Sequence, residues 1–228
     1  MSMLIGYYLE GDRKMLIVDN IDVVGFEPAI RGMRNPMNSW EKSDSDFHCI
    51  ARPGKESYAE IGDNDLKLMK RLFKAGTEHR KYLRMIQVYM DIEANQTFWS
   101  QFDTYKIATV KNSCSKMHKI HTICFIGEDC CDHEGIDAVG GEVKEHFYNT
   151  MGVLENLRIK FNETHEKKYW RALIEILPMG FRLKATVMLS YETVFNIIRQ
   201  RKNHKLDEWH QLIDELETLP YVKEIMGE

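Results

Sequence analysis

The sequence predicts a mixed α and β fold, and three observations support this. Short apolar runs such as 4–8 and 15–18 are bounded by polar turn residues, as strands are. Apolar residues recur at helical spacing from about residue 143 onward. The chain has 228 residues, 43% of them hydrophobic, which suffices to bury a substantial core. Because no internal repeat or linker divides the sequence, residues 1–228 are expected to form a single domain.

The composition argues against several classes of protein. A formal charge of -4 gives no basic excess to neutralise a nucleic acid backbone. The apolar run 3–9 meets Glu10 too early for a signal peptide, and no window approaches the roughly 20 apolar residues of a membrane span. Five cysteines, an odd number, do not suit a disulfide framework. The sequence therefore predicts a cytoplasmic protein without nucleic acid or membrane partners.

The N-terminal half is expected to begin with a hairpin, in which the runs 4–8 and 15–18 flank the polar turn 10–13. Residues 31–63 contain several breakers and few periodic apolar residues, so a loop-rich stretch is predicted there. The elements expected next are a helix from residues 63–65 to Gly76, a strand over 82–92 and a helix over 95–105.

Residues 127–142 are acidic and contain glycines, which predicts a variable surface loop. Helical spacing returns after it, and Ser190 is expected to cap one of the helices. The helices predicted in this half span 143–161, 167–176, the residues following Ser190, and 206–219 before Pro220.

A cluster of cysteines and histidines is the first candidate for chemistry. Cys114, His118 and His121 would share one face if residues 113–124 were helical. However, the segment has no paired C-x-x-C motif, and a Cys114–His118 catalytic pair would lack a third, orienting group. Buried or surface thiols are the alternative, and no metal is predicted.

The basic residues are more informative. Lys106, Lys111 and Lys116 lie in a segment rich in hydroxyl groups, where backbone N–H groups, hydroxyls and a positive charge together suit a phosphate. The alternative is that these lysines only solvate exposed faces. The common phosphate-binding loops are absent from the sequence. These residues favour a small, nucleotide-like ligand.

The segment 98–116 resembles the signature region of flavin-dependent thymidylate synthases. In that family a glutamine precedes an Arg-His-Arg triplet, and a serine follows within a polar loop. Aligned without gaps, Gln101 falls on the glutamine and Thr104, Tyr105 and Lys106 fall on the triplet. Ile107 follows the triplet directly.

The same alignment covers the loop that follows. Cys114 takes the position of the serine, with Ser115 one residue further on. Lys116 takes the position of the arginine that holds the nucleotide phosphate, and Asn112 replaces a glutamate.

A second block resembles the family in the C-terminal half. After Leu177 and Pro178, Lys184 falls on an arginine of a strand, although Arg182 could serve after a small shift. Arg201 falls on a helix arginine that reaches the substrate base, and Trp209 matches after a one-residue insertion. The remaining matches are Asn196 and His79, each near a family residue that borders the flavin.

The resemblance implies an α+β fold with a central, mostly antiparallel sheet flanked by helices. It implies reductive methylation of dUMP to dTMP, with FAD as cofactor and with NADPH and methylene-tetrahydrofolate as co-substrates. It also implies a homotetramer in which residues from different chains complete each site, and no indispensable nucleophile. The implied substrate-binding residues are Gln101, Asn112, Cys114, Ser115, Lys116, Lys184 and Arg201. The implied cofactor-binding residues are His79, Thr104, Tyr105, Lys106, Ile107 and Asn196.

The substitutions in the triplet leave three hypotheses. Thr104, Tyr105 and Lys106 carry one positive charge where the family has two, and lysine does not reproduce the bidentate contacts of arginine. The first hypothesis is a divergent flavin-dependent enzyme acting on a pyrimidine nucleotide. The second is a nucleotide-binding or regulatory protein that has lost turnover. The third is a structural oligomer without a ligand, which leaves the retained lysines unexplained.

Overall fold

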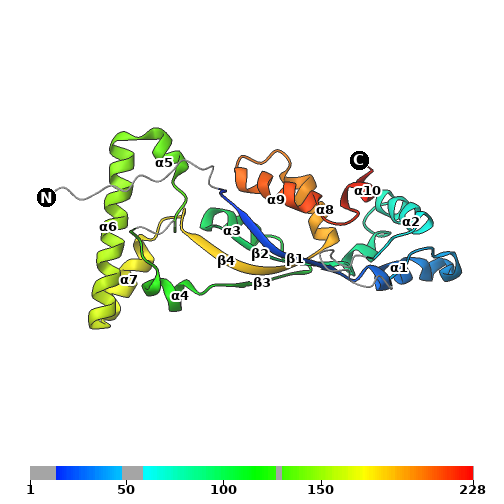
Figure 1. Ribbon diagram of the computed structural model, residues 1–228, viewed down its shortest axis with the longest axis horizontal. Coiled ribbons are helices and arrows are strands. Elements are labelled where there is room, and N and C mark those ends of the chain that lie inside the picture. The colour runs from blue at the N-terminus through cyan, green and yellow to red at the C-terminus, as the bar shows by residue number, and fades with distance from the viewer. Residues whose placement is uncertain (1–13, 48–58, 127–129, 228) are drawn as a thin grey trace.

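The fold is known from a computed structural model that describes residues 14–47, 59–126 and 130–227 (Figure 1). Its centre is an antiparallel sheet in the order β1-β2-β4-β3. The strands are β1 (Ile17–Val24), β2 (Gln87–Asn95), β3 (Thr109–Ser113) and β4 (Arg182–Ser190). The α-helices are α1 (Phe26–Arg34), α2 (Asp63–Lys74), α3 (Gln96–Phe102), α4 (Lys116–Lys119), α5 (Glu134–Val139), α6 (Gly141–Thr164), α7 (Lys167–Ile176), α8 (Tyr191–Arg201), α9 (Asp207–Glu217) and α10 (Val222–Met226).

Most predicted helices are confirmed. α2 begins at Asp63, and Gly76 follows its end. α7 spans the predicted residues 167–176. α8 starts directly after Ser190, whose hydroxyl accepts a hydrogen bond from the Thr193 amide as predicted for an N-cap. The local capping and apolar spacing were therefore reliable signals for these elements.

Four expectations need correction. The run 15–18 does not end at Val18 but continues into β1, which pairs with β2; its expected hairpin partner, 4–8, lies outside the described residues. The strand predicted over 82–92 begins at Gln87, since Lys81–Arg84 forms a 3-10 helix. The loop-rich stretch begins later than expected because α1 extends to Arg34. The prediction of a loop over 127–142 is wrong for Glu134–Val139, which is helical.

The two faces of the sheet differ. On β2, Val88, Met90, Ile92 and Ala94 are buried, whereas Tyr89 between them is exposed. This alternation is the period-2 pattern of a strand with one face in the core. Figure 1 shows α3, α8 and α9 on the buried side of the sheet. The side chains that build any ligand site on α3 or α8 therefore lie on this side.

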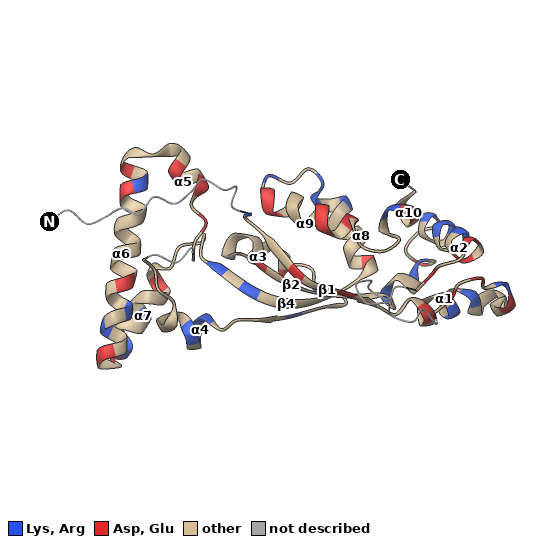
Figure 2. Cartoon of the chain, viewed as in Figure 1, with Lys and Arg blue, Asp and Glu red and all other residues tan. Residues whose placement is uncertain are grey.

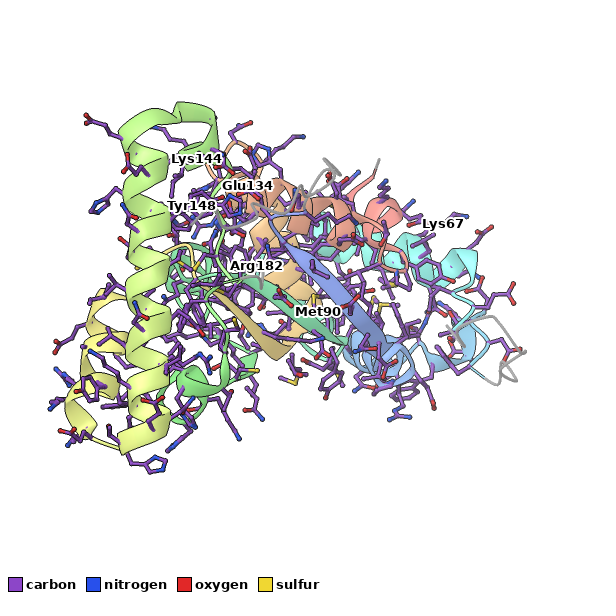
Figure 3. The ribbon with its side chains drawn as sticks, turned by 60° about the vertical axis from the view of Figure 1, so that its left-hand side comes forward. Lys67, Met90, Glu134, Lys144, Tyr148 and Arg182 are labelled. Atoms are coloured by element: carbon purple, nitrogen blue, oxygen red, sulfur yellow. The ribbon has the colours of Figure 1, made fainter. Side chains whose placement is uncertain are left out.

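A second apolar cluster lies at the far end of β4, where α6 and α7 pack together (Figure 1). It includes Leu154, Leu173 and Phe181, and partly buried Leu183 contacts both this cluster and the main core. We call the part of the molecule built around this cluster, with α6 and α7, the lobe. Figure 3 places Arg182 between the sheet and the helices of the lobe. Arg182 donates hydrogen bonds to Asp132 at 2.8 Å and Glu93 at 3.0 Å, which ties the lobe to the sheet. That residues 1–228 form a single domain stays a prediction.

A buried ion pair fixes α1 against α2. The Nε atom of Arg34 lies 2.6 Å from Oδ1 of Asp65, and the two side chains are 5% and 0% exposed. Hydroxyl groups of Ser43 and Ser45 donate to Oδ2 of Asp65 at 2.6 and 2.7 Å. Burial alone would raise the pKa of the Asp65 carboxyl, but these donors and Arg34 hold its pKa below the ordinary value.

The turn between β1 and α1 requires glycine. Gly25 has a φ of 95°, and a Cβ atom there would lie 2.2 Å from the carbonyl oxygen of Met85. A side chain at this position would therefore force the backbone of Met85 away. In the described part of the chain, no helix is both long and apolar enough to span a bilayer.

Candidate functional site

The segment 95–119 folds as α3, a turn, β3 and α4, and its polar residues fix both helix starts. The Asn95 side chain accepts a hydrogen bond from the Phe98 amide at 2.9 Å and so caps α3. The Ser115 hydroxyl accepts from the His118 amide at 3.3 Å and caps α4. Between them, β3 pairs along β4 in antiparallel register. The hydroxyl-rich loop of the sequence is therefore a strand flanked by two capped helices.

A pocket of about 210 Å3 opens where α3 faces the end of β3. It is lined by Gln96, Trp99, Ser100, Asp103, Lys111, Ser113, Cys114, Lys116 and Leu183. We call it the lysine pocket. Its wall carries two ammonium groups, two hydroxyls and a thiol but a single carboxylate, which suits an anion.

Lys116 is the partly buried cation of the lysine pocket. Its ammonium group donates a hydrogen bond to the side-chain oxygen of Gln96, which carries no charge. Burial, together with the nearby charge of Lys111, lowers the pKa of the Lys116 ammonium below its ordinary value. A bound anion would remove this electrostatic penalty.

Lys111 is the second cation of the lysine pocket. Its ammonium nitrogen lies 5.0 Å from the centre of the Trp99 ring and pairs with the Asp103 carboxylate. Sequence reasoning placed Lys111 in a segment suited to binding a phosphate, but did not include it among the binding residues. The available signal was its position on β3, because Lys111 and Ser113 are two residues apart and share one face of the strand.

Lys184 and Asn112 do not lie in this pocket within one chain. The neighbour of Lys184 on β4, Leu183, lines the pocket, and adjacent strand residues point to opposite faces. The Lys184 ammonium lies 3.6 Å from Asp91 and 4.0 Å from Asp19. Asn112 is exposed on β3. Figure 2 shows the positive charges of β4 and of α4 at separate places on the cartoon.

Arg182, the alternative to Lys184, is held by contacts within the protein. Besides its pairs with Glu93 and Asp132, it donates to the Lys14 carbonyl at 3.1 Å, and its side chain is 4% exposed. Its engagement with two carboxylates raises the pKa of its guanidinium, although burial opposes this. The buried contacts of Arg182 favour a structural role.

Three expected binding residues and the aligned Trp209 meet near the C-terminal end of α3. Gln101, Tyr105, Arg201 and Trp209 form what we call the arginine cluster. The Arg201 guanidinium lies 4.5 Å from the Trp209 ring centre, and its Nε atom donates to the Tyr105 hydroxyl at 3.0 Å. The Gln101 side-chain oxygen accepts from Trp209 Nε1 at 3.0 Å and from Arg201 at 3.5 Å. Residues about 100 positions apart in the sequence are thus held in one cluster.

Only two of the expected cofactor residues line a common pocket. Ile107 and Asn196 line a second pocket of about 220 Å3, together with Arg84, Ser190, Glu192 and Thr193. Ile107 is 81% exposed, while its carbonyl accepts from the Thr193 hydroxyl at 3.2 Å. The side chains of Thr104, Lys106 and His79 are exposed outside this pocket.

Sequence reasoning missed the ion pairs beside this second pocket. Glu192 pairs with Arg84, and Arg80 lies 3.7 Å from it. These contacts join residues more than 100 positions apart, so no local pattern could have revealed them.

The cysteine and histidine cluster does not share a helical face. Cys114 follows β3 directly and precedes α4, which spans only Lys116–Lys119. Its amide donates to the Lys184 carbonyl at 2.9 Å, extending the strand pairing. The helix conditionally assumed over 113–124 is therefore wrong. Within the described ranges, no group of three or more His, Cys, Asp or Glu residues could hold a metal ion.

The α+β arrangement, with its antiparallel sheet and flanking helices, is the fold of flavin-dependent thymidylate synthases, so the predicted fold class is confirmed. One similar structure is flavin-dependent thymidylate synthase ThyX from Helicobacter pylori, complexed with FAD and dUMP. It matches with a TM-score of 0.64 and 15% identity over 94% of this chain and 98% of that chain. A second structure of Helicobacter pylori ThyX with FAD and dUMP matches with a TM-score of 0.64 and 16% identity over 93% and 96%. The chain matches no protein-family model and no curated protein sequence.

Proposed function

We propose that the chain is a divergent flavin-dependent thymidylate synthase-like enzyme that reductively methylates a pyrimidine deoxynucleotide, dUMP or a variant of it. The lysine pocket carries this proposal. It places a partly buried Lys116 with a lowered pKa beside hydroxyl and thiol groups, on a fold whose solved relatives were crystallised with FAD and dUMP. A pocket with such a cation is suited to a phosphate.

The proposed roles follow the two groups of residues. Lys116 holds the phosphate, with Cys114 and Ser115 beside it. Gln101 and Arg201 address the base, because an amide and a guanidinium supply the hydrogen bonds that a pyrimidine edge requires. Asn112 and Lys184 face away from the lysine pocket of their own chain, so we assign them to the site of a neighbouring chain in a homotetramer.

The residues proposed for FAD fit one edge of a flavin site. Ile107 and Asn196 line a pocket of about 220 Å3, below the roughly 300–1,000 Å3 of complete ligand pockets. His79, Thr104, Tyr105 and Lys106 would border the remainder, so one chain supplies only part of the site. FAD, when bound and reduced by NADPH, supplies the hydride, and methylene-tetrahydrofolate the carbon. The proposed compartment is the cytoplasm.

A nucleotide-binding protein without turnover is the second candidate. The observation in its favour is that Tyr105, which stands in the family triplet, binds Arg201 and Gln200 through its hydroxyl. A tyrosine hydroxyl engaged in this way is not available to hydrogen-bond a cofactor. Flavin binding separates the two candidates.

Nucleotide binding tests both candidates. With dUMP at about 100 times its Kd, we expect roughly 2.7 kcal/mol of added stability, which is about 5–10 °C in Tm for a chain of this size. Lys116→Ala should abolish the shift because it removes the partly buried cation. Lys119→Ala is the matched control, since Lys119 lies on the same helix but outside the lysine pocket. An unchanged shift in Lys116→Ala would contradict the proposed site.

The flavin part is tested by an absorbance scan of protein purified in the dark, followed by titration with FAD. A flavin band, and NADPH oxidation that depends on dUMP, would support the enzyme. Nucleotide binding without flavin binding at high micromolar FAD would leave the second candidate. Absence of both would overturn the proposal.

A further inference from the structure

Two like charges share the lysine pocket. Lys111 extends from β3 and Lys116 from α4, and their ammonium groups are close enough for the charge of Lys111 to lower the pKa of Lys116. Among the described residues that line the pocket, only Asp103 carries a negative charge, and it pairs with Lys111. The pocket therefore has one positive charge in excess. If a ligand displaced Asp103, both ammonium groups would need compensation, and a ligand with a single negative charge would balance only one of them.

We propose that Lys111 is a second phosphate-binding residue and that it makes the pocket selective for a dianionic phosphate monoester over a singly charged group. This inference rests on the proposed function and adds a residue to its phosphate site. Two ammonium groups contributed by different elements can contact different oxygen atoms of one phosphate. A charge of -2 then balances both cations in a partly buried setting.

Asp103 is the competing group. Its side chain is 54% exposed, whereas that of Lys111 is 24% exposed. The carboxylate can therefore turn into solvent at low cost, because a half-exposed ion pair contributes little stability. Lys111 remains beside Trp99 when Asp103 leaves, since its ammonium also lies over that ring. A dianion replaces the carboxylate, while a monoanion competes with it poorly.

The test is calorimetric titration of the full-length protein with dUMP, with the singly charged deoxyuridine 5′-sulfate, and with uncharged deoxyuridine. The wild type should prefer dUMP over the sulfate by roughly 10- to 100-fold, the value of one charged hydrogen bond. Lys111→Gln should weaken dUMP binding by a similar factor and largely remove the preference. Asp103→Asn should tighten binding of both anions, by about two- to five-fold.

Two further variants separate the inference from its alternatives. Lys111→Arg keeps the charge and should retain the preference, which a purely structural role of Lys111 would not require. Lys119→Gln controls for the general loss of a lysine. Loss of dUMP binding in Lys116→Ala with an unchanged preference in Lys111→Gln would overturn this inference and leave the proposed function standing. No dUMP binding by the wild type would overturn both.

Discussion

Replacing Asp65 with alanine is expected to lower the free energy of unfolding by about 3–5 kcal/mol, the typical cost of removing one partner of a buried ion pair. The substitution leaves the Arg34 guanidinium buried without its carboxylate. It also removes the acceptor of the Ser43 and Ser45 hydroxyls, which hold the chain between α1 and α2. Urea unfolding of the purified protein would measure the change.

Asp63→Ala is the matched control for this substitution. Asp63 lies in the same first turn of α2 but is exposed. Its favourable interaction with the helix dipole is worth about 0.3–1 kcal/mol. If both variants lost the same small amount, the ion pair between Arg34 and Asp65 would not stabilise the fold as described.

The same carboxylate makes the stability depend on pH. The pKa of Asp65 is lower in the folded protein than its ordinary value of 3.8, so its stabilising contribution is complete above that value and is lost as the pH falls through the lower, folded-state pKa. The difference in unfolding free energy between wild type and Asp65→Asn should therefore shrink below about pH 4. A difference that stayed constant from pH 7 to pH 3 would contradict this account.

The second large effect is expected for Trp209→Ala, which should lower the free energy of unfolding by about 3–5 kcal/mol. Trp209 is 0% exposed. Its ring centre lies 4.8 Å from that of Phe98, and it stacks on Phe102 at an interplanar angle of 14°. Removing the indole opens a cavity beneath the Arg201 guanidinium and deprives Gln101 of a donor. Thermal or urea unfolding measures the loss.

Trp40→Ala provides the comparison, because Trp40 is 50% exposed. Its loss should change stability by no more than about 0.5 kcal/mol. The stability loss of Trp209→Phe should lie between these two values. The variant keeps an aromatic ring but loses the N–H group that donates a hydrogen bond to Gln101. Equal effects at positions 40 and 209 would refute the core role of Trp209.

The fold could be predicted from the sequence wherever a local signal and the core agreed. The repeat of Leu66, Met69 and Leu72 with a following glycine gave α2. α1 shows the limit of this reasoning. Its buried residues Phe26, Ala29, Ile30 and Met33 also have helical spacing. No helix was predicted there, because the breakers that follow, among them Asn35 and Pro36, indicated a loop-rich stretch from residue 31. Pro28 lies in the first turn of α1, where proline is tolerated.

The site could be predicted only in part, since its geometry depends on pairings between distant segments. Alignment to a known signature region singled out Lys116, Gln101 and Arg201, but it assigned Tyr105 to the cofactor and did not predict its hydrogen bond with Arg201. Lys111 was not assigned because its proximity to Lys116 depends on how β3 and α4 pack against α3. The separation of Lys184 from Lys116 depends on the register of β4, which local sequence does not fix.

The position of β3 at the edge of the sheet has a consequence for the energetics of binding. Within the described part of the chain, β3 pairs with β4 alone, whereas β2 and β4 each have two neighbouring strands. Its five residues can therefore separate from β4 without breaking the β2–β4 ladder, at a free energy below that of global unfolding. Because Lys111 and Ser113 are carried by this strand, a ligand that contacts them also stabilises the closed edge. Part of its intrinsic affinity would then be spent on ordering β3, and the measured affinity would vary with the population of the closed strand.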